Sequence, residues 1–280
     1  MNLIQSILMG IVQGLSEFLP ISSSAHLVFT SNFYKVFKNI PISEQSTEEI
    51  FLDIMLHLGT LIAVLIFFRK DVAEICKALF FAVKKKSLAE YNARLGLYII
   101  LGTIITILTA FPLEKVAAHL VFHPSIVGGL LIITGGILFL SEYLSKQQAR
   151  KEEVGKEEAI LTGLAQGIAV LPGFSRSGWT IATGMFSGLN RETAARYSFL
   201  LSIPIILGAS MVYPLIKIDI SEAAKYSWTA ITAGTAVSGI TGYICIKYFM
   251  KFISKFSLNI FGWYCVIMGT FTTIFFCIYK

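Results

Sequence analysis

The sequence has little charge and little cysteine. Only 14% of its 280 residues are Asp, Glu, Lys or Arg, whereas soluble domains usually carry about 25%. The four cysteines show no C-x-x-C spacing, which excludes a disulfide scaffold and gives no sign of a metal or redox pair. The 22 glycines show no three-residue period, which excludes a collagenous chain. The composition is instead 55% hydrophobic with a mean hydropathy of +0.72, which indicates a multi-span membrane protein.

Long apolar runs predict how often the chain crosses a membrane. A bilayer core of about 30 Å needs about 20 apolar residues as helix. Six segments meet this requirement: residues 51–68, 95–113, 126–144, 197–216, 228–249 and 258–279. We therefore expect one all-α integral membrane domain over residues 1–280, with six transmembrane helices.

Two further stretches, residues 1–30 and 157–188, are less apolar and are interrupted by Pro20 and Pro172. They resemble each other: GIVQGLSEFLPISSSAHL begins at Gly10 and GLAQGIAVLPGFSRSGWT begins at Gly163. Broken segments that recur in two halves are typical of inverted-topology repeats, where they meet near the midplane. We expect two re-entrant helix hairpins, each followed by three spans. Repeat 1 covers about 1–150 and repeat 2 about 155–280.

Positive charge predicts the orientation, since cytoplasmic loops carry excess Lys and Arg. With the predicted spans, sixteen of the 23 Lys and Arg residues fall on one side and six on the other, while Arg176 lies in the second hairpin. We therefore expect both termini outside the cell. The net charge of +6 is explained by these loops, and we expect no nucleic-acid partner.

The first hairpin carries a candidate cation site. Ionisable residues at membrane depth are costly and are functional candidates by default. Gln13 and Glu17 are four residues apart on one helix face, and their oxygens suit a hard cation such as Mg²⁺ or Ca²⁺. The alternative is that Glu17 only pairs with Arg176 to neutralise both charges. Ser23 falls in a serine run typical of a helix cap, and His26 is either a catalyst or a buried structural histidine.

The second hairpin carries a candidate anion site. Pro172 and Gly173 predict a turn, and Ser175, Arg176, Ser177 and Thr180 follow it. A guanidinium beside the free N–H groups of a helix start binds phosphate well. The site could hold a diphosphate whose lipid tail remains in hydrocarbon. Asp53 and His57 share a face of the first span, where capping or hydrogen bonding between helices explains them equally well.

Three segments now give a family resemblance: QGLSEFLPISSSAHL (Gln13–Leu27), DIMLHLGTLIAV (Asp53–Val64) and LPGFSRSGWT (Leu171–Thr180). They closely resemble the signature segments of the bacterial undecaprenyl-diphosphate phosphatase, or bacitracin-resistance, family. The resemblance covers essentially the whole chain. Gln13 stands where the family often has Glu, and Ala25 where Gly is common.

The resemblance implies a phosphatase of the cytoplasmic membrane that hydrolyses undecaprenyl diphosphate and recycles the carrier lipid for peptidoglycan synthesis. It also implies bacitracin resistance, dependence on Mg²⁺ or Ca²⁺, and an active site that opens to the extracytoplasmic side. On this basis we expect Glu17, His26 and Arg176 to be catalytic, with His26 as base or nucleophile. We expect Gln13 and Glu17 to hold the cation. We expect Ser23, Ser175, Ser177 and Thr180 to bind substrate by hydrogen bonds, and favour this role for Ser23 and Ser175 over the alternative that one of them is the nucleophile.

A lipid flippase or secondary transporter is the alternative, because inverted repeats with broken helices are the architecture of many transporters. The set of Glu17, His26 and Arg176 favours hydrolysis. The sequence leaves the oligomeric state open: Gly128, Gly129, Gly135 and Gly136 suit packing within the chain or a homodimer equally well.

Overall fold

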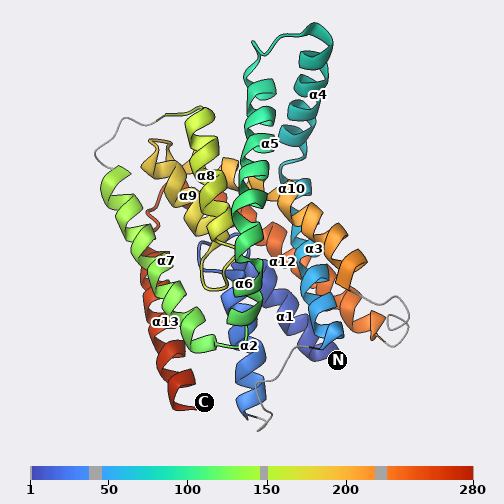
Figure 1. The fold of residues 1–280 in the computed structure, drawn as a ribbon, viewed down its shortest axis with the longest axis vertical. Helices are drawn as coiled ribbons and strands as arrows, with labels where there is room; N and C mark the ends of the chain where they lie inside the picture. Colours follow the sequence, from blue (N-terminus) through green and yellow to red (C-terminus); the bar gives the residue numbers. More distant parts are fainter. Residues whose placement is uncertain (1, 38–45, 146–150, 218–225, 280) are drawn as a thin grey trace.

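The computed structural model describes residues 2–37, 46–145, 151–217 and 226–279. Within these ranges the chain is helical, with no strand beyond an isolated bridge between Lys151 and Leu189. The elements, shown in Figure 1, are α1 (Leu3–Ser16), α2 (Ser23–Phe37), α3 (Thr47–Phe67), α4 (Arg69–Lys85), α5 (Tyr91–Ala110), the 3₁₀ turn η1 (Phe111–Leu113), α6 (Glu114–Leu120), α7 (Pro124–Ser145), α8 (Lys156–Ile168), α9 (Arg176–Phe186), α10 (Arg191–Lys217), α12 (Trp228–Ile253) and α13 (Asn259–Ile278).

In the described part of the chain, six helical segments are long and apolar enough to cross a membrane, which confirms the six predicted spans. Their bounds are Thr47–Phe67, Tyr91–Leu120, Pro124–Ser145, Arg191–Val212, Trp228–Ile253 and Asn259–Ile278. The fourth begins at Arg191, earlier than the predicted residue 197, because the charged first turn of α10 is helical as well. Large side chains such as Trp263 and Ile267 on α13 are exposed, as expected for a surface that faces lipid. The all-α membrane fold is confirmed.

Each interrupted stretch forms a pair of short helices. α1 leads into α2 through a turn at residues 17–22, in which Ser22 has φ of 68°. α8 leads into α9 through a turn in which Gly173 has φ of 105°, a conformation that glycine adopts without strain. In Figure 1 the first pair lies toward the end of the bundle that carries both termini, and the second toward the other end. That the pairs are re-entrant in a bilayer stays a prediction.

Each pair of short helices packs on a long helix from the other half of the chain. α1 packs along α12, and α8 packs along α5. The same motif glycine makes both contacts: a Cβ on Gly10 would overlap the carbonyl oxygen of Gly234, and one on Gly163 would lie 2.7 Å from that of Gly102. Small residues are what allows helices to approach so closely in membranes. The matched contacts are what the predicted inverted repeat would produce.

The glycines of α7 divide between two roles. Gly128 and Gly135 face α13, where an added Cβ would lie 2.8 Å from the Gly269 carbonyl oxygen and 2.7 Å from that of Gly262, respectively. An added Cβ on Gly129 or Gly136 would meet no described atom within 4 Å. Half of this glycine set therefore serves packing within the chain, and the homodimer stays a prediction.

A buried ion pair fixes the end of the bundle opposite the termini. Glu142 of α7 is 1% exposed and accepts two hydrogen bonds from Arg191 of α10, one of them from Nε at 2.8 Å. The same carboxylate accepts the backbone N–H of Leu258, which precedes α13, at 2.9 Å. One carboxylate therefore ties three helices together. Because both partners are satisfied, the buried charge is tolerated.

The close approach of α1 to α12 predicts that Gly10→Val destabilises the protein. The new side chain must push the two backbones apart, and overpacking of this kind typically costs about 1–3 kcal/mol. The measurement is thermal unfolding of the purified protein in detergent. Gly129→Val is the matched control, since its side chain enters open space and should change the free energy of unfolding by less than about 0.5 kcal/mol. Equal losses for the two variants would contradict the packing.

Candidate functional site

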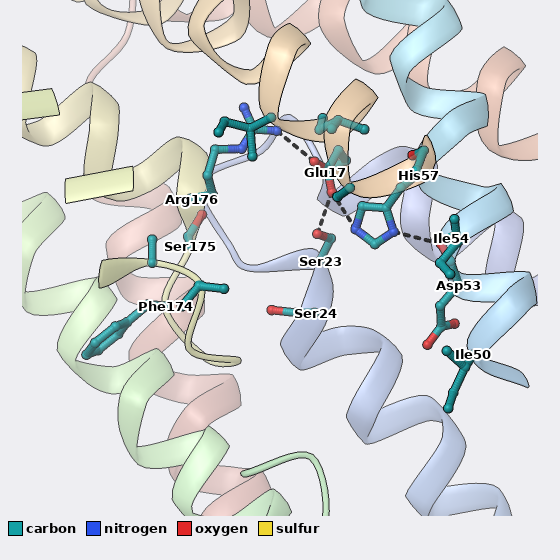
Figure 2. Close-up of a pocket in the computed structure, with 16 residues that line it drawn as sticks. Glu17, Ser23, Ser24, Ile50, Asp53, Ile54, His57, Phe174, Ser175 and Arg176 are labelled. Atoms are coloured by element: carbon teal, nitrogen blue, oxygen red, sulfur yellow. Dashed lines mark hydrogen bonds and ion pairs between the residues drawn. The ribbon is translucent and has the colours of Figure 1, made fainter. Parts of the chain in front are cut away.

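A cavity of about 360 Å³ lies where the two helix pairs meet α3 and α10. Its polar lining comes from the end of α1, the start of α2, α3 and the start of α9, as Figure 2 shows for most of these residues. Its apolar lining comes from α3, the turn between α8 and α9, and α10. The lining residues are Glu17, Ser23, Ser24, Ile50, Asp53, Ile54, His57, Ala169, Val170, Phe174, Ser175, Arg176, Ile205, Ile206, Ala209 and Ser210. One part of the cavity is therefore lined by charged and polar groups, and the rest is apolar.

Glu17 is the centre of the charged part. The residue is 7% exposed and caps the C-terminus of α1. Its Oε1 accepts a hydrogen bond from Arg176 Nη2 at 2.6 Å. Its Oε2 accepts one from Ser23 Oγ at 2.6 Å and one from Gln13 Nε2 at 2.9 Å. A single carboxylate thus joins both helix pairs, and the ion pair considered from the sequence is present.

Contacts between the two turns hold this arrangement in place. Ser177 Oγ, in the first turn of α9, donates to the Leu19 carbonyl at 2.9 Å. Gly178 lies against Pro20, where an added Cβ would come within 3.3 Å of the proline ring. Thr134 of α7 supports the second turn, since its hydroxyl donates to the Gly173 carbonyl at 3.2 Å. The site therefore depends on both turns being formed.

The start of α9 is suited to an anion. Ser175 caps the helix by accepting the Gly178 N–H at 3.1 Å, and the N–H groups of the first turn add a positive dipole end. Arg176 Nη1 is buried, and no described residue accepts a hydrogen bond from it. An orphaned guanidinium donor beside a helix N-terminus favours a phosphate oxygen as its partner.

His57 and Asp53 of α3 add titratable groups to the cavity. His57 Nδ1 lies 2.7 Å from the Asp53 carbonyl oxygen. A carbonyl only accepts, so Nδ1 carries a proton and Nε2 is the variable nitrogen. Nε2 lies 3.7 Å from Glu17 Oε2. Asp53 Oδ1 is buried and has no hydrogen-bond partner among the described residues.

The oxygen atoms of Gln13 and Glu17 are of the type that binds a hard divalent cation, but Gln13 does not line the cavity. Gln13 is fully buried and donates its amide N–H to Glu17, which leaves Gln13 Oε1 without a donor in the described part of the chain. An orphaned amide oxygen next to a carboxylate is the donor chemistry that Mg²⁺ and Ca²⁺ prefer. The described residues contain no group of three or more His, Cys, Asp or Glu that could hold a metal alone, so such an ion would need oxygens from substrate or water.

Four of the predicted site residues line the cavity: Glu17, Ser23, Ser175 and Arg176. His26 does not. Its Nδ1 donates to the Ser22 carbonyl at 2.7 Å, and its Nε2 meets the Tyr264 hydroxyl at 2.7 Å on α13. The imidazole also stacks on the Tyr264 ring with centroids 5.6 Å apart. The structure therefore does not bring His26 to Glu17, contrary to the arrangement expected from the sequence.

Ser177 and Thr180 also lie outside the cavity lining. Ser177 uses its hydroxyl to join the two turns, as described above. Thr180 lies one turn further along α9, where its hydroxyl donates to the Arg176 carbonyl at 2.8 Å and lies 2.6 Å from Ser198 Oγ on α10. Both hydroxyls bond to other protein groups around Arg176. Neither lines the cavity, so the structure does not place them where the expected substrate contacts would form.

The cavity also contains residues that were not predicted as site residues. Asp53 and His57 carried a signal, because charged groups four residues apart at the start of a span are unusual. Ser24 is the next residue after Ser23 in the serine run. The α10 wall, Ile205–Ser210, carried no signal, since apolar residues in a span look alike whether they face lipid, protein or a cavity.

Comparison with known proteins identifies related sequences over nearly the whole chain. Residues 6–271 match the family model described as bacitracin resistance protein BacA. The undecaprenyl-diphosphatases of Methanobrevibacter smithii and Halothermothrix orenii are each 39% identical to this chain, with 96% of both chains covered. The undecaprenyl-diphosphatase of Methanosphaera stadtmanae is also 39% identical, with 98% of both chains covered.

The buried pair predicts strong energetic coupling between Glu17 and Arg176. Their side chains are 6% and 17% exposed. Glu17→Leu should lower the free energy of unfolding by about 3–5 kcal/mol, because it leaves a buried guanidinium uncompensated. Adding Arg176→Met should recover much of that loss. A double-mutant cycle on unfolding in detergent measures the coupling.

The exposed pair Arg94 and Glu153, 3.7 Å apart, is the control, and its coupling should stay below about 1 kcal/mol. Strictly additive effects at Glu17 and Arg176 would show that the contact carries no energy.

Proposed function

The chain belongs to the bacitracin resistance protein BacA family, and from that premise we propose that the cavity at Glu17, Ser23 and Arg176 is its active site. The activity is hydrolysis of undecaprenyl diphosphate to undecaprenyl phosphate and inorganic phosphate, which recycles the lipid carrier for cell-wall synthesis and underlies bacitracin resistance. The observation that carries the assignment is the meeting, at one end of a largely apolar cavity, of a carboxylate, a serine hydroxyl and a guanidinium whose Nη1 has no partner among the described residues.

The cavity matches the two chemical parts of this substrate. The diphosphate meets Arg176 and the N-terminus of α9, which supply positive charge where phosphoryl transfer needs it. The isoprenoid chain meets apolar side chains, including Ile50 and Ile54 of α3 and Ile206 of α10. Burial of a lipid chain against such side chains is favourable, and the charged end of the cavity then fixes which end of the lipid reacts.

The geometry supports Ser23 as the nucleophile. Its hydroxyl donates to Glu17 at 2.6 Å, the relation of a nucleophile to its general base. Ser23 Oγ attacks the terminal phosphorus, its proton passes to Glu17, and the bond from that phosphorus to the bridging oxygen breaks to release undecaprenyl phosphate. Water then hydrolyses the phosphoserine, which releases inorganic phosphate and restores the hydroxyl. This role replaces the hydrogen-bonding role expected for Ser23 from the sequence.

In this scheme His57 is the histidine that takes part in proton transfer, whereas the sequence suggested His26 for the catalytic histidine. His57 Nε2 is 3.7 Å from Glu17 Oε2, so the proton that Glu17 collects would reach it through one bridging water or after the two groups move closer. The proposed cofactor is Mg²⁺ or Ca²⁺ held by Gln13 and Glu17, as their oxygens allow. When bound, the cation would neutralise charge on the diphosphate.

The proposed orientation places the site on the extracytoplasmic side of the cytoplasmic membrane. Both termini lie at one end of the bundle and the helical pair of α4 and α5 projects at the other (Figure 1). That projecting tip carries the run Lys84–Lys86, which favours a cytoplasmic location. The cavity is lined by the first half of α3 and the second half of the α10 span, so it lies toward the termini.

A flippase remains the second candidate, because α1 and α8 exchange partners between the halves of the chain as in many transporters. The two functions separate experimentally. A flippase should move labelled lipid across vesicles without releasing phosphate, and it should keep doing so when Ser23 is replaced by Ala.

We predict that purified protein in detergent releases inorganic phosphate from undecaprenyl diphosphate and that a chelator stops the release. Glu17→Ala and Arg176→Ala should each lower the rate by at least about 100-fold, the typical loss when a group that stabilises the transition state is removed. The control is Lys77→Ala, an exposed residue outside the cavity, which should keep wild-type turnover. Folded wild type that releases no phosphate with any divalent cation would contradict the proposal.

We also predict that rapid quenching during turnover of substrate labelled in its terminal phosphate traps a phosphoserine at Ser23. Phosphoserine survives acid and is lost in base, whereas phosphohistidine shows the opposite pattern, so the two are distinguished directly. Ser23→Ala should abolish the trapped label, and His26→Ala should retain it. A base-stable label at His26 would restore the role expected from the sequence.

A further inference from the structure

Two histidines outside the cavity face each other where α6 meets α7. His119 lies near the end of α6 and His123 directly precedes Pro124 at the start of α7. Their Nε2 atoms are 3.0 Å apart and their ring centroids 4.6 Å apart. His119 is exposed and His123 is half-buried, so both rings are accessible to solvent.

These rings differ from the other two imidazoles of the chain. His26 and His57 each donate Nδ1–H to a backbone carbonyl, which fixes the ring. Within the described part of the chain, the rings of His119 and His123 bond only to each other. In this hydrogen bond one Nε2 donates and the other accepts. Once the shared proton is displaced and both rings are neutral, each Nε2 has a lone pair available.

The spacing is that of two ligands of one metal ion. Zinc–nitrogen bonds are about 2.0–2.1 Å long, so two nitrogens on one ion lie about 3.0–3.4 Å apart at angles between right and tetrahedral. The observed 3.0 Å falls at this separation.

We propose that His119 and His123 form a bidentate site for a borderline transition-metal ion, Zn²⁺ or Cu²⁺. Imidazole suits these ions, whereas Mg²⁺ and Ca²⁺ require oxygen ligands, so the site is chemically distinct from the cation site proposed beside Glu17. Water completes the coordination, because no third His, Cys, Asp or Glu joins the pair within the described residues.

The bound ion links the end of α6 to the start of α7. None of the residues of η1 and α6 is buried, so this segment is held by few contacts of its own. The junction of α6 and α7 lies at the end of the bundle that carries both termini (Figure 1), the side on which the active site is proposed to open. The ion therefore anchors the connection between two spans from the extracytoplasmic face.

The test uses full-length wild-type protein without a histidine tag, in buffer with excess MgCl₂ to occupy the cation site proposed beside Glu17. Titration with ZnCl₂ should give one Zn²⁺ per chain by calorimetry. His119→Gln and His123→Gln should each weaken Zn²⁺ binding at least 10-fold. Lys115→Gln, an exposed change on the same helix, should keep it.

Electron paramagnetic resonance with Cu²⁺ gives a second readout. Two imidazole nitrogens should appear in the spectrum, falling to one in each His→Gln variant. Zn²⁺ affinity unchanged by both His→Gln substitutions, or absent from folded protein with both histidines intact, would overturn the site. Neither result depends on phosphate release, so the site and the proposed function can fail separately.

Discussion

The ion pair between Glu17 and Arg176 is the constraint on which the site depends. The two residues are 159 positions apart, and each would carry an uncompensated charge inside an apolar bundle without the other. Breaking a buried pair is strongly destabilising, whereas keeping it requires that both turns reach the same place. The meeting of the two turns is therefore an energetic necessity of the fold as well as a feature of the cavity.

Several other features follow from this meeting. The glycines of the repeated motif let α1 and α8 pack closely on α12 and α5, which brings the ends of the short helices together. Ser177 and Leu19 join the turns by a hydrogen bond, and Thr134 supports the second turn from α7. Among the described residues, Arg176 Nη1, Gln13 Oε1 and Asp53 Oδ1 are then left without hydrogen-bond partners. Groups left unsatisfied in a well-packed site are those that a ligand completes.

Most of the fold could be predicted from the sequence, because its signals are local. Six apolar runs predicted six spans, and Pro20 with Pro172 marked the broken segments. Glu17 and Arg176 were found because charge at membrane depth is rare and expensive. The partners of His26 could not be found in this way: its ring contacts Tyr264, 238 positions away, and no local pattern indicates that contact. The same holds for His57, which turns toward Glu17 because α3 packs beside α1, and for the α10 wall. The helix α4 was also missed, since its apolar residues alternate with charges.

The most direct test of the account is an experimental structure with a non-hydrolysable diphosphate lipid, in which a methylene group replaces the bridging oxygen. The account predicts that the terminal phosphonate contacts Arg176 and the N-terminus of α9, with Ser23 Oγ in line with the phosphorus and the lipid chain along α3 and α10. Binding of the diphosphate elsewhere, such as in the separate cavity lined by Asp71, Glu74 and Arg196, would contradict it.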